Sequence, residues 1–324
     1  MSVNLTIIMY HYVRDLRRSR YPRIKGLDLD AFRGQLEYLA RHYQVIDAAR
    51  LLRAVRGEEA LPPRAAFLTF DDGYLDHFTA VMPLLVARKW SAAFFPVAST
   101  VTEHRLLDVN KIHFVLAATP ETNRVAQRII SAVESNRARL ALHELREYQE
   151  RCRGDSRYDS AEVTFIKRML QRELPEAFRA QLIDDLFREF VTADESAFAA
   201  ELYMNSDQLR CMLDCGMSIG SHGVGHYWMN TLTPEAQRHE VDASLEFLAT
   251  LGVAPRDWLM CYPYGGYNES LLEILRQRQC ALGFSVRVGI ARAGVDDPLT
   301  LPRLDTNDLP VSATAAPTQW TAQA

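Results

Sequence analysis

The fold of this chain is decided by the stretch Ala65-Ala66-Phe67-Leu68-Thr69-Phe70-Asp71-Asp72-Gly73. Its first six residues form a short, largely apolar run that predicts a buried strand, and the run ends in two carboxylates and a glycine. In parallel α/β folds, functional side chains gather in the loops that follow the strands. We therefore expect this strand to deliver Asp71 and Asp72 to a functional edge of the fold.

Similar apolar runs recur along the chain and alternate with segments of helical periodicity. Apolar residues at helical spacing predict helices over about residues 28–41 and 74–89, and further helices begin near residues 206, 234 and 268. This alternation is typical of a parallel α/β fold. The predicted strands are residues 5–10, 65–70, 92–97, 217–220, 258–262, 282–286 and 299–304.

The alternation stops after about residue 99 and resumes near residue 206. The residues between are rich in Arg, Glu, Leu and Ala at the spacing of amphipathic helices. We expect a barrel formed by residues 1–103 and 206–310, interrupted by a helical insertion over residues 104–205. The last residues, 311–324, carry no periodic pattern, and we expect them to be disordered.

Composition indicates an ordinary globular protein. Hydrophobic residues make up 48% of the 324 residues and charged residues 24%, and the net charge of −4 offers no broad basic face for nucleic acid. No apolar run approaches the roughly 20 residues that a membrane-spanning helix needs. The first residues lack the basic region and apolar stretch of a secretory signal, so we expect a cytoplasmic location. The sequence assigns no oligomeric state.

The cysteine content is consistent with the expected cytoplasmic location. Five cysteines are an odd number without the spacing of a disulfide framework, and this predicts reduced thiols. Cys211 and Cys215 lie one helical turn apart, but no second Cys or His pair with zinc-finger spacing accompanies them. We expect these two side chains to be buried, because a free cysteine packs as a small hydrophobic residue.

Two short motifs carry candidate metal chemistry. Asp71 and Asp72 are adjacent, so their side chains point in different directions and can serve a water and a metal separately; alone, such a motif is more often a turn. His222 and His226 lie four residues apart in a Gly-rich segment after a predicted strand, and neutral imidazole suits zinc. Two unrelated loop histidines are the alternative. Two His and one Asp would leave coordination positions open, as in catalytic sites.

The third motif is Cys261-Tyr262-Pro263-Tyr264-Gly265, a strand end that turns towards a helix. Such a turn can aim a backbone N–H at an oxyanion, although a plain turn explains the sequence equally well. In this order, and each at a strand end, the three motifs resemble the polysaccharide deacetylase family with the NodB homology domain, which is similar to carbohydrate esterase family 4. The resemblance covers the chain outside the helical insertion and the tail. It implies an α/β fold, a distorted (β/α)7 barrel.

The resemblance also implies an activity and a set of residue roles. The family's members are hydrolases that remove N-acetyl groups from sugars by cleaving a linear amide, with one divalent metal ion. By position, Asp71 would be the general base, and Asp72, His222 and His226 would bind the metal. The backbone N–H of Tyr264 would help to hold the oxyanion and the substrate. Zinc is the expected ion, with Co²⁺, Ni²⁺ and Mn²⁺ as alternatives.

The sequence departs from the family pattern in three places. Gly223 stands where Ser or Thr usually follows the first histidine, so one supporting hydrogen bond must come from elsewhere. Cys261 stands where an arginine usually orients the base, and we expect Arg303 to replace it. The usual Leu-x-His, which supplies the general acid, is absent, since no histidine follows His239.

His11 is the candidate for the missing acid. It ends the first predicted strand, and the first and last strands are neighbours in a closed barrel. Deacetylases that resemble the poly-N-acetylglucosamine type likewise carry their acid histidine at this strand. A histidine packed at the barrel rim without a catalytic role is the alternative. Where the insertion leaves the barrel, Asn110 and Lys111 are candidates for substrate contact and His113 is a weaker candidate for the acid; solvated helix-cap residues explain all three equally well.

The expected function is removal of an N-acetyl group from an N-acetylated sugar, nucleotide-linked or lipid-linked, during surface polysaccharide biosynthesis. Lipopolysaccharide O-antigen and capsule are the expected products of such carbohydrate metabolism. Two alternatives remain. One is a non-sugar amidohydrolase of the same fold, against which the intact Asp72, His222 and His226 argue. The other is an inactive glycan-binding relative, favoured only by the missing Arg and Leu-x-His.

Overall fold

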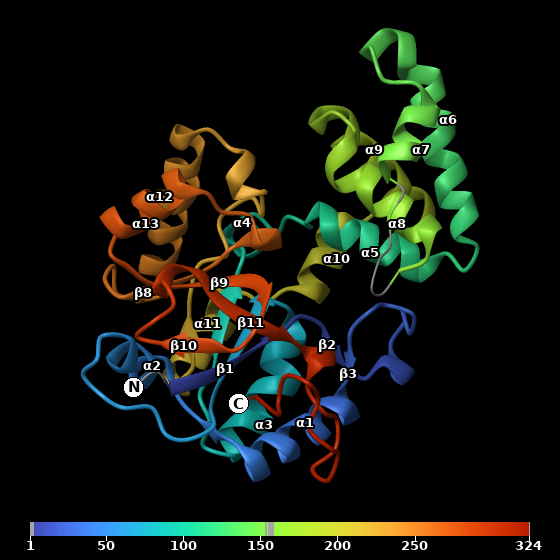
Figure 1. Cartoon of the computed structure of the whole chain (residues 1–324). Coiled ribbons are helices and arrows are strands. Elements are labelled where there is room, and N and C mark those ends of the chain that lie inside the picture. Colours follow the sequence, from blue (N-terminus) through green and yellow to red (C-terminus); the bar gives the residue numbers. More distant parts are fainter. Residues whose placement is uncertain (1–2, 153, 155–158, 324) are drawn as a thin grey trace. The chain divides into compact units, whose positions relative to one another are not determined.

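The computed structural model describes residues 3–152, 154 and 159–323, and their contacts divide the chain into two compact units. The first unit consists of Met1–Asp15, Gly26–Arg105 and Ala199–Ala324, and the second of Leu16–Lys25 and Leu106–Phe198. Figure 1 colours both units along the sequence. The second unit lies within the predicted insertion, except that it also takes in Leu16–Lys25.

The first unit is built on a nearly closed barrel of parallel strands (Figure 1). Its strands lie in the order β7-β6-β5-β1-β11-β9-β8, and a parallel bridge between Ser221 and Met260 joins the two ends of this order. Each strand coincides with a strand predicted from the sequence, which confirms the fold class. The strands are β1 (Val3–Tyr10), β5 (Ala65–Asp72), β6 (Ala93–Pro96), β7 (Ser218–Ile219), β8 (Trp258–Cys261), β9 (Cys280–Val288) and β11 (Leu301–Asp305).

Burial on both faces explains why these strands are continuous apolar runs. Every residue of β5 is buried. Phe67 packs in one hydrophobic cluster with residues of β6, β8 and β9, whereas Leu68 and Phe70 pack in another with helix α1 (Leu29–His42). Alternate residues of the strand thus face the barrel interior and the surrounding helices.

Four short strands were not predicted from the sequence. β4 (Gln44–Val45) on β5 and β10 (Ala291–Ala293) antiparallel to β1 extend this sheet, and β2 (Val13–Arg14) and β3 (Leu27–Asp28) form a separate two-stranded sheet. Segments of two or three residues carry no periodicity, so a pattern search passes over them.

Helices surround the barrel and begin at polar caps. The side chains of Asp28, Asn205, Thr233 and Asn268 accept a backbone N–H at the starts of α1, α11, α12 and α13. The predicted helix over residues 74–89 is interrupted: a π-helical turn, His77–Val81, precedes α3 (Met82–Ala87). Pro83 has no backbone N–H for an α-helical bond at this point, which accounts for the changed register. The other helices are α2 (Ala48–Val55), α4 (Ala98–Thr102), α11 (Ser206–Asp214), α12 (Pro234–Thr250) and α13 (Glu269–Gln277).

The tail, for which the sequence predicted disorder, makes defined contacts over its described residues. Thr321 is fully buried, and the Tyr38 hydroxyl donates to its Oγ1 at 3.3 Å. Arg64 donates to the Thr321 carbonyl at 3.2 Å, and His42 contacts the Ala313 carbonyl at 3.2 Å. These contacts use single polar atoms, which leave no periodic trace in a sequence.

The second unit is helical. Its core includes Phe114, whose ring centroid lies 4.7 Å from that of Phe198 and 5.0 Å from that of Tyr21. Its helices are α5 (Asp108–Ala118), α6 (Thr122–Leu140), α7 (Leu145–Cys152), α8 (Ala161–Arg168), a π-helical turn (Met169–Glu173), α9 (Glu176–Phe190) and the start of α10 (Glu195–Leu202).

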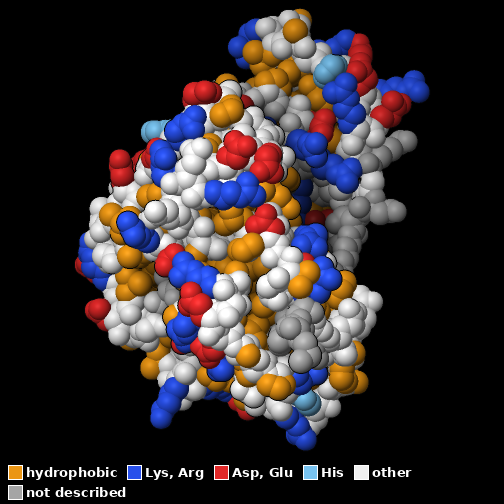
Figure 2. Space-filling model, turned by 60° about the vertical axis from the view of Figure 1, so that its left-hand side comes forward, with side chains coloured by type: hydrophobic (Ala, Val, Ile, Leu, Met, Phe, Trp, Pro, Cys, Tyr) orange, Lys and Arg blue, Asp and Glu red, His pale blue; other side chains and the backbone are white. Residues whose placement is uncertain are grey.

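Lys and Arg side chains are interspersed with Asp and Glu side chains over the face drawn in Figure 2.

Cys211 and Cys215 are exposed, so the expectation that they are buried was wrong. The buried face of α11 is formed by Leu209 and Met212, which turns both thiols outward. Within the described residues, no helix combines the length and apolar character needed to cross a membrane.

Candidate metal-dependent active site

The two aspartates at the end of β5 are both buried and held in different surroundings. Asp71 is 2% exposed and Asp72 4%. The chain then turns sharply, with φ of 71° at Asp72 and 70° at Gly73. A side chain at residue 73 would meet Pro96 at 2.8 Å, so this position requires glycine. The strained turn is of the kind that collects at functional sites.

Arg303 binds Asp71 at two points. Nη1 donates to Oδ1 at 2.9 Å and Nη2 to Oδ2 at 2.8 Å, and the guanidinium is fully buried. Nε also donates to the Ser285 carbonyl at 2.9 Å, which fixes the plane of the fork. The structure thus places Arg303 where the sequence analysis expected the replacement cation. Burial would raise the pKa of Asp71, but Arg303 and His11 lower it to about 2, so the carboxylate is ionised.

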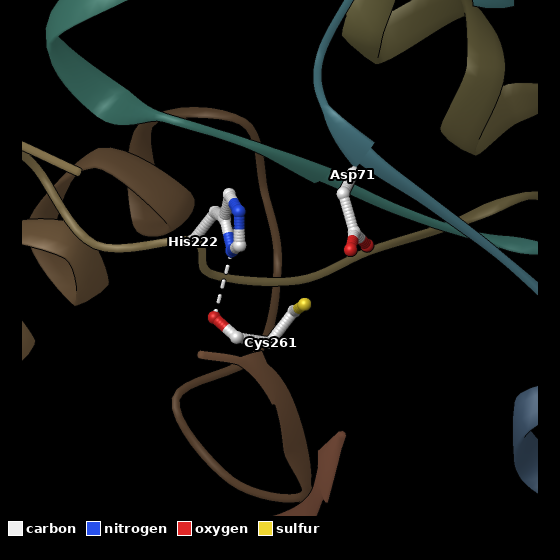
Figure 3. A group of neighbouring side chains, drawn as sticks. All are labelled: Asp71, His222 and Cys261. Atoms are coloured by element: carbon white, nitrogen blue, oxygen red, sulfur yellow. Dashed lines mark hydrogen bonds between the residues drawn. The ribbon is translucent and has the colours of Figure 1, made fainter. Parts of the chain in front are cut away.

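Cys261 leaves room for this arginine. Its thiol accepts a hydrogen bond from Arg303 Nη2 at 3.2 Å, and burial raises its pKa. Figure 3 shows the Cys261 sulfur with the side chains of Asp71 and His222, three residues whose donor atoms lie within 4.8 Å of one another. Because the Arg303 guanidinium already binds Asp71 and Cys261, a metal ion between these side chains is disfavoured. The donor set that fits a metal is the neighbouring one.

That set is Asp72, His222 and His226, whose ligand atoms lie within 4.8 Å of one another. Nε2 of each histidine lies 3.4 Å from Asp72 Oδ1. His222 Nδ1 lies 2.8 Å from the Cys261 carbonyl, which can only accept, so Nδ1 carries the hydrogen and the Nε2 lone pair faces Asp72. The carboxylate and imidazole donors therefore converge on one point.

The hydrogen bonding around Asp72 supports a cation at this point. Oδ2 accepts a hydrogen bond from the Tyr74 hydroxyl at 2.6 Å, whereas Oδ1 is buried and has no hydrogen-bond partner among the described residues. A buried carboxylate oxygen without a partner is costly. A divalent cation satisfies this oxygen and both imidazoles at once, with positions left open, so the residues present fit a catalytic metal site.

The pKa values of this group show what the cation would replace. Burial would raise the pKa of Asp72, but contact with His222 and His226 holds it well below its usual range. Burial lowers the pKa of His226, which favours the neutral ligand form. Burial would also lower the pKa of His222, yet Cys261 and Asp72 raise it. A proton on His222 and a metal ion therefore compete for the same place.

The loop that carries both histidines is supported by Glu240. Its Oε2 accepts the backbone N–H of Val224 at 2.8 Å and of Gly225 at 3.0 Å. Ser221 Oγ accepts the N–H of Gly223 at 3.1 Å. The φ of 74° at residue 223 lies in the left-handed region that favours glycine. Glu240 and Ser221 supply the supporting hydrogen bonds that a Ser or Thr at this position would otherwise provide. Glu240 could not be predicted from a motif, because it lies on α12, outside all three motifs.

His11 lies beside Asp71 at the end of β1. Its Nε2 is 3.8 Å from Asp71 Oδ2, beyond hydrogen-bond length, and its side chain is 42% exposed. His77 Nε2 donates to the His11 carbonyl at 2.8 Å and so holds the backbone in place. The structure thus brings His11 to the candidate site with access to solvent protons.

An aromatic pair lies next to the metal ligands. The Tyr264 ring stacks on Trp228, with centroids 4.7 Å apart and planes at 7°, and meets the His226 ring edge-on at 4.6 Å. Tyr264 itself has φ of 55°, in the turn that follows β8. Trp228 Nε1 is buried without a hydrogen-bond partner among the described residues. Trp228 was not predicted as a site residue, although its position two residues after His226 was a signal.

Asn110 and Lys111 lie on α5 of the second unit and are buried there. Lys111 Nζ contacts Asp184 at 2.6 Å and Glu195 at 2.8 Å, so its charge is already paired within that unit. Substrate contact by either residue stays a prediction. His113, on the same helix, lines a pocket of the second unit.

Comparison with known proteins agrees with this geometry. A family model described as polysaccharide deacetylase matches residues 58–143 and 187–282, more than half of the chain. The poly-beta-1,6-N-acetyl-D-glucosamine N-deacetylase of Escherichia coli K12 is 38% identical over 95 residues, which are 29% of this chain and 14% of that protein. The chain thus aligns with only a small part of this relative.

Solved structures share the fold. The deacetylase PplD of Streptococcus pyogenes, solved with acetate, has a TM-score of 0.57 and 17% identity, with 94% of this chain and 93% of that chain covered. IcaB of Ammonifex degensii has a TM-score of 0.55 and 19% identity, with 93% and 91% covered. Because the family model matches more than half of the chain and the three sequence motifs meet around Asp72, the chain belongs to the polysaccharide deacetylase family.

Proposed function

We propose that this chain is a metal-dependent N-deacetylase that removes the acetyl group from an N-acetylated sugar. The observation that carries the proposal is the convergence of His222 and His226 on the unpartnered Oδ1 of Asp72, next to the Asp71–Arg303 pair. Hydrolysis of an amide needs an activated water, stabilisation of the oxyanion and a proton for the leaving nitrogen. The residues at this site can supply each.

Asp71 is suited to take the proton of the attacking water. A divalent ion held by Asp72, His222 and His226 would act as a Lewis acid and would lower the pKa of water from 15.7 towards roughly 7. The low pKa of Asp71, about 2, keeps its carboxylate ionised and able to accept a proton. Arg303 keeps Asp71 ionised and fixes the direction of its oxygens.

His11 is suited to protonate the leaving amine. Its Nε2 lies 3.8 Å from Asp71 Oδ2, beside the proposed base, and its side chain is 42% exposed to solvent. The backbone N–H of Tyr264, in the turn beside His226, is assigned to the oxyanion. The chain then needs no histidine on its last strand.

The aromatic pair supports a sugar as the substrate. The Tyr264 and Trp228 rings lie beside the metal ligands and offer an apolar face to the C–H groups of a sugar ring. The E. coli relative is named for an N-acetyl-D-glucosamine polymer, which is consistent with an N-acetylglucosamine-type sugar here. We further propose a nucleotide-linked or lipid-linked precursor of lipopolysaccharide O-antigen or capsule, processed in the cytoplasm.

The test is acetate release by the purified chain. The panel contains an N-acetylglucosamine nucleotide sugar, a lipid-linked N-acetylglucosamine, poly-N-acetylglucosamine and a non-sugar acetamide. We expect activity on a sugar, loss after chelation, and recovery with Zn²⁺ or, less fully, with Co²⁺, Ni²⁺ or Mn²⁺. Asp71→Asn is the inactive control. Cleavage of the acetamide alone, or full activity in chelator, contradicts the proposal. Turnover of polymer alone, or the chain in a periplasmic fraction, rejects its carrier-linked, cytoplasmic part.

A further inference from the structure

The Tyr74 hydroxyl lies against one of the proposed metal ligands. Tyr74 follows the sharp turn at Asp72 and Gly73 and is 1% exposed. Its hydroxyl donates to Asp72 Oδ2 at 2.6 Å, a length typical of a hydroxyl bound to an ionised carboxylate. An ionised carboxylate has no proton to donate, so the direction of this hydrogen bond is fixed.

The two oxygens of Asp72 are therefore not equivalent. Oδ2 is bound by Tyr74, whereas Oδ1 has no hydrogen-bond partner among the described residues and lies 3.4 Å from Nε2 of both His222 and His226. The last torsion of an aspartate side chain is soft and roughly two-fold, so either oxygen, or both, could otherwise turn towards the imidazoles. The hydrogen bond from Tyr74 removes this freedom.

The Tyr74 ring is held independently of this hydrogen bond. It stacks on the Tyr12 ring, with centroids 4.1 Å apart and planes at 19°, and on the Tyr203 ring, with centroids 6.1 Å apart and planes at 12°. An antiparallel bridge joins Tyr74 to Tyr203, and the Met204 N–H donates to the Gly73 carbonyl at 3.0 Å. All these residues belong to the first unit. The fold thus sets the position of the hydroxyl, and the carboxylate follows it.

The number of carboxylate oxygens that face an ion affects which ion fits. Catalytic zinc sites have few protein ligands and keep a position open. Larger ions such as Ca²⁺ take more oxygen ligands and bind both oxygens of a carboxylate, and Mn²⁺ also suits carboxylate ligands. One oxygen of Asp72 beside two imidazoles therefore fits zinc, whereas two oxygens would fill a further position and favour the other ions.

We propose that Tyr74 is a positioning residue that presents only Asp72 Oδ1 to the metal, and that it thereby raises the affinity for zinc and selects zinc over Mn²⁺. Tyr74 acts through Asp72 and needs no contact with the ion or the substrate. The inference rests on the metal dependence of the proposed function and deepens it, because it names a residue that determines which ion the site prefers.

The test is Tyr74→Phe, which removes the hydroxyl and keeps the ring for both stacks. The full chain is freed of metal with a chelator, the chelator is removed, and calorimetric titration with Zn²⁺ and with Mn²⁺ gives the Kd of each ion. We expect the Kd for Zn²⁺ to rise about tenfold to hundredfold, the usual effect of removing a hydrogen-bond partner of a metal ligand. The Kd for Mn²⁺ should change less than about threefold, because both carboxylate oxygens become available to that ion.

A second variant tests the support of the hydroxyl. Tyr203→Leu removes one of the two stacked rings and leaves the Tyr74 hydroxyl in the chain. It should weaken zinc binding in the same direction but less, about twofold to tenfold. This variant also decides the matter if Tyr74→Phe does not fold.

Tyr38→Phe is the matched control. Tyr38 is also fully buried, and its hydroxyl donates to Thr321 Oγ1 in the tail at 3.3 Å. Because this hydrogen bond involves no metal ligand, the Kd for Zn²⁺ should stay within about twofold of the wild-type value. Thermal melts show whether each variant is folded.

An unchanged Kd for Zn²⁺ in folded Tyr74→Phe, or equal weakening in Tyr38→Phe, would overturn the assignment of Tyr74. A Kd that rises equally for Zn²⁺ and Mn²⁺ would overturn its role in selecting the ion. A wild-type chain that binds no zinc would overturn this inference and metal dependence together. If the wild type binds zinc but releases no acetate from the panel, the deacetylase function fails, whereas the titrations still decide the role of Tyr74.

Discussion

Arg303 on β11 forms a two-point ion pair with Asp71 on β5, reaching past β1, the strand that lies between them in the sheet. A register shift between Leu301 and Arg303 in the pairing of β11 with β9 accompanies this reach. The pair is fully buried, so each partner depends on the other. Removing one leaves an uncompensated charge in the interior.

Arg303→Met should therefore be severe in two ways. The free energy of unfolding should fall by about 3–5 kcal/mol, the usual cost of breaking a buried pair. Without Arg303, burial of Asp71 is offset less and its pKa rises from about 2, so the acid limb of the activity profile should move to higher pH. Denaturant unfolding and a profile of kcat/KM against pH measure the two effects. Arg303→Lys keeps the charge and should shift the acid limb less. If the acid limb of Arg303→Met does not move, titration of Asp71 is not the cause of that limb.

The adjacent aspartates provide a matched pair of substitutions. Asp71→Asn should lower kcat by about 10²–10⁴ with the metal content nearly unchanged, because Asp71 is assigned to the water and not to the ion. Asp72→Asn replaces a charged metal ligand by a neutral side chain of the same size, and this variant should lose the metal as well as the activity. His11→Ala should behave like Asp71→Asn. Metal analysis beside kinetics decides, and stoichiometric metal loss in Asp71→Asn or His11→Ala would reject this division of roles.

Much of this site follows from the sequence for a simple physical reason. Strands buried on both faces appear as continuous apolar runs, and the side chains that follow them meet at one end of a parallel barrel. The choice of His11 rested on closure of the barrel, in which the first and last strands are neighbours, and β1 does pair with β11. The adjacency of these two strands supported the choice of His11, for which there was no local motif.

Other features had no local signal. Glu240 supports the histidine loop from a helix 16 residues away from Val224, and its role depends on how that helix packs. The tail contacts made by Thr321 depend equally on tertiary structure. Cys211 was assigned to the wrong face of its helix because Leu209 and Met212 form the buried face alone. Periodicity predicts that a helix is amphipathic, but a cysteine fits either face.

Trp228 tests the assignment of a sugar substrate. Trp228→Ala removes one ring of the stacked pair and should raise KM about threefold to tenfold, since an aromatic contact contributes roughly 0.5–1.5 kcal/mol. The kcat value should change less, because Trp228 contacts Tyr264 and no metal ligand in the described interactions. Trp228→Phe, which keeps a ring, should retain most of the affinity. A KM unchanged in Trp228→Ala for every sugar of the panel would place the sugar ring elsewhere.

His77 provides a stability prediction that does not depend on turnover. Burial lowers its pKa from 6.5 to about 4, and its ring is fully buried in the π-helical turn below His11. Because the folded-state pKa is below the unfolded one, the unfolded chain binds the proton first as the pH falls. Stability should therefore decrease from about pH 6.5 and the decrease should be complete below about pH 4, with up to about 3 kcal/mol lost.

The control for this prediction is His77→Gln, which can still donate a hydrogen bond to the His11 carbonyl but does not titrate. Urea unfolding of both proteins is followed between pH 7 and pH 4 with chelator present, so that metal binding adds no pH dependence of its own. Carboxylates titrate in both proteins and cancel in the comparison. The wild-type curve should fall more steeply than that of His77→Gln over this interval. The Phe70 and Phe94 rings around His77 indicate that burial depresses its pKa. Parallel curves would contradict this and would mean that His77 is protonated in the folded chain as readily as in the unfolded chain.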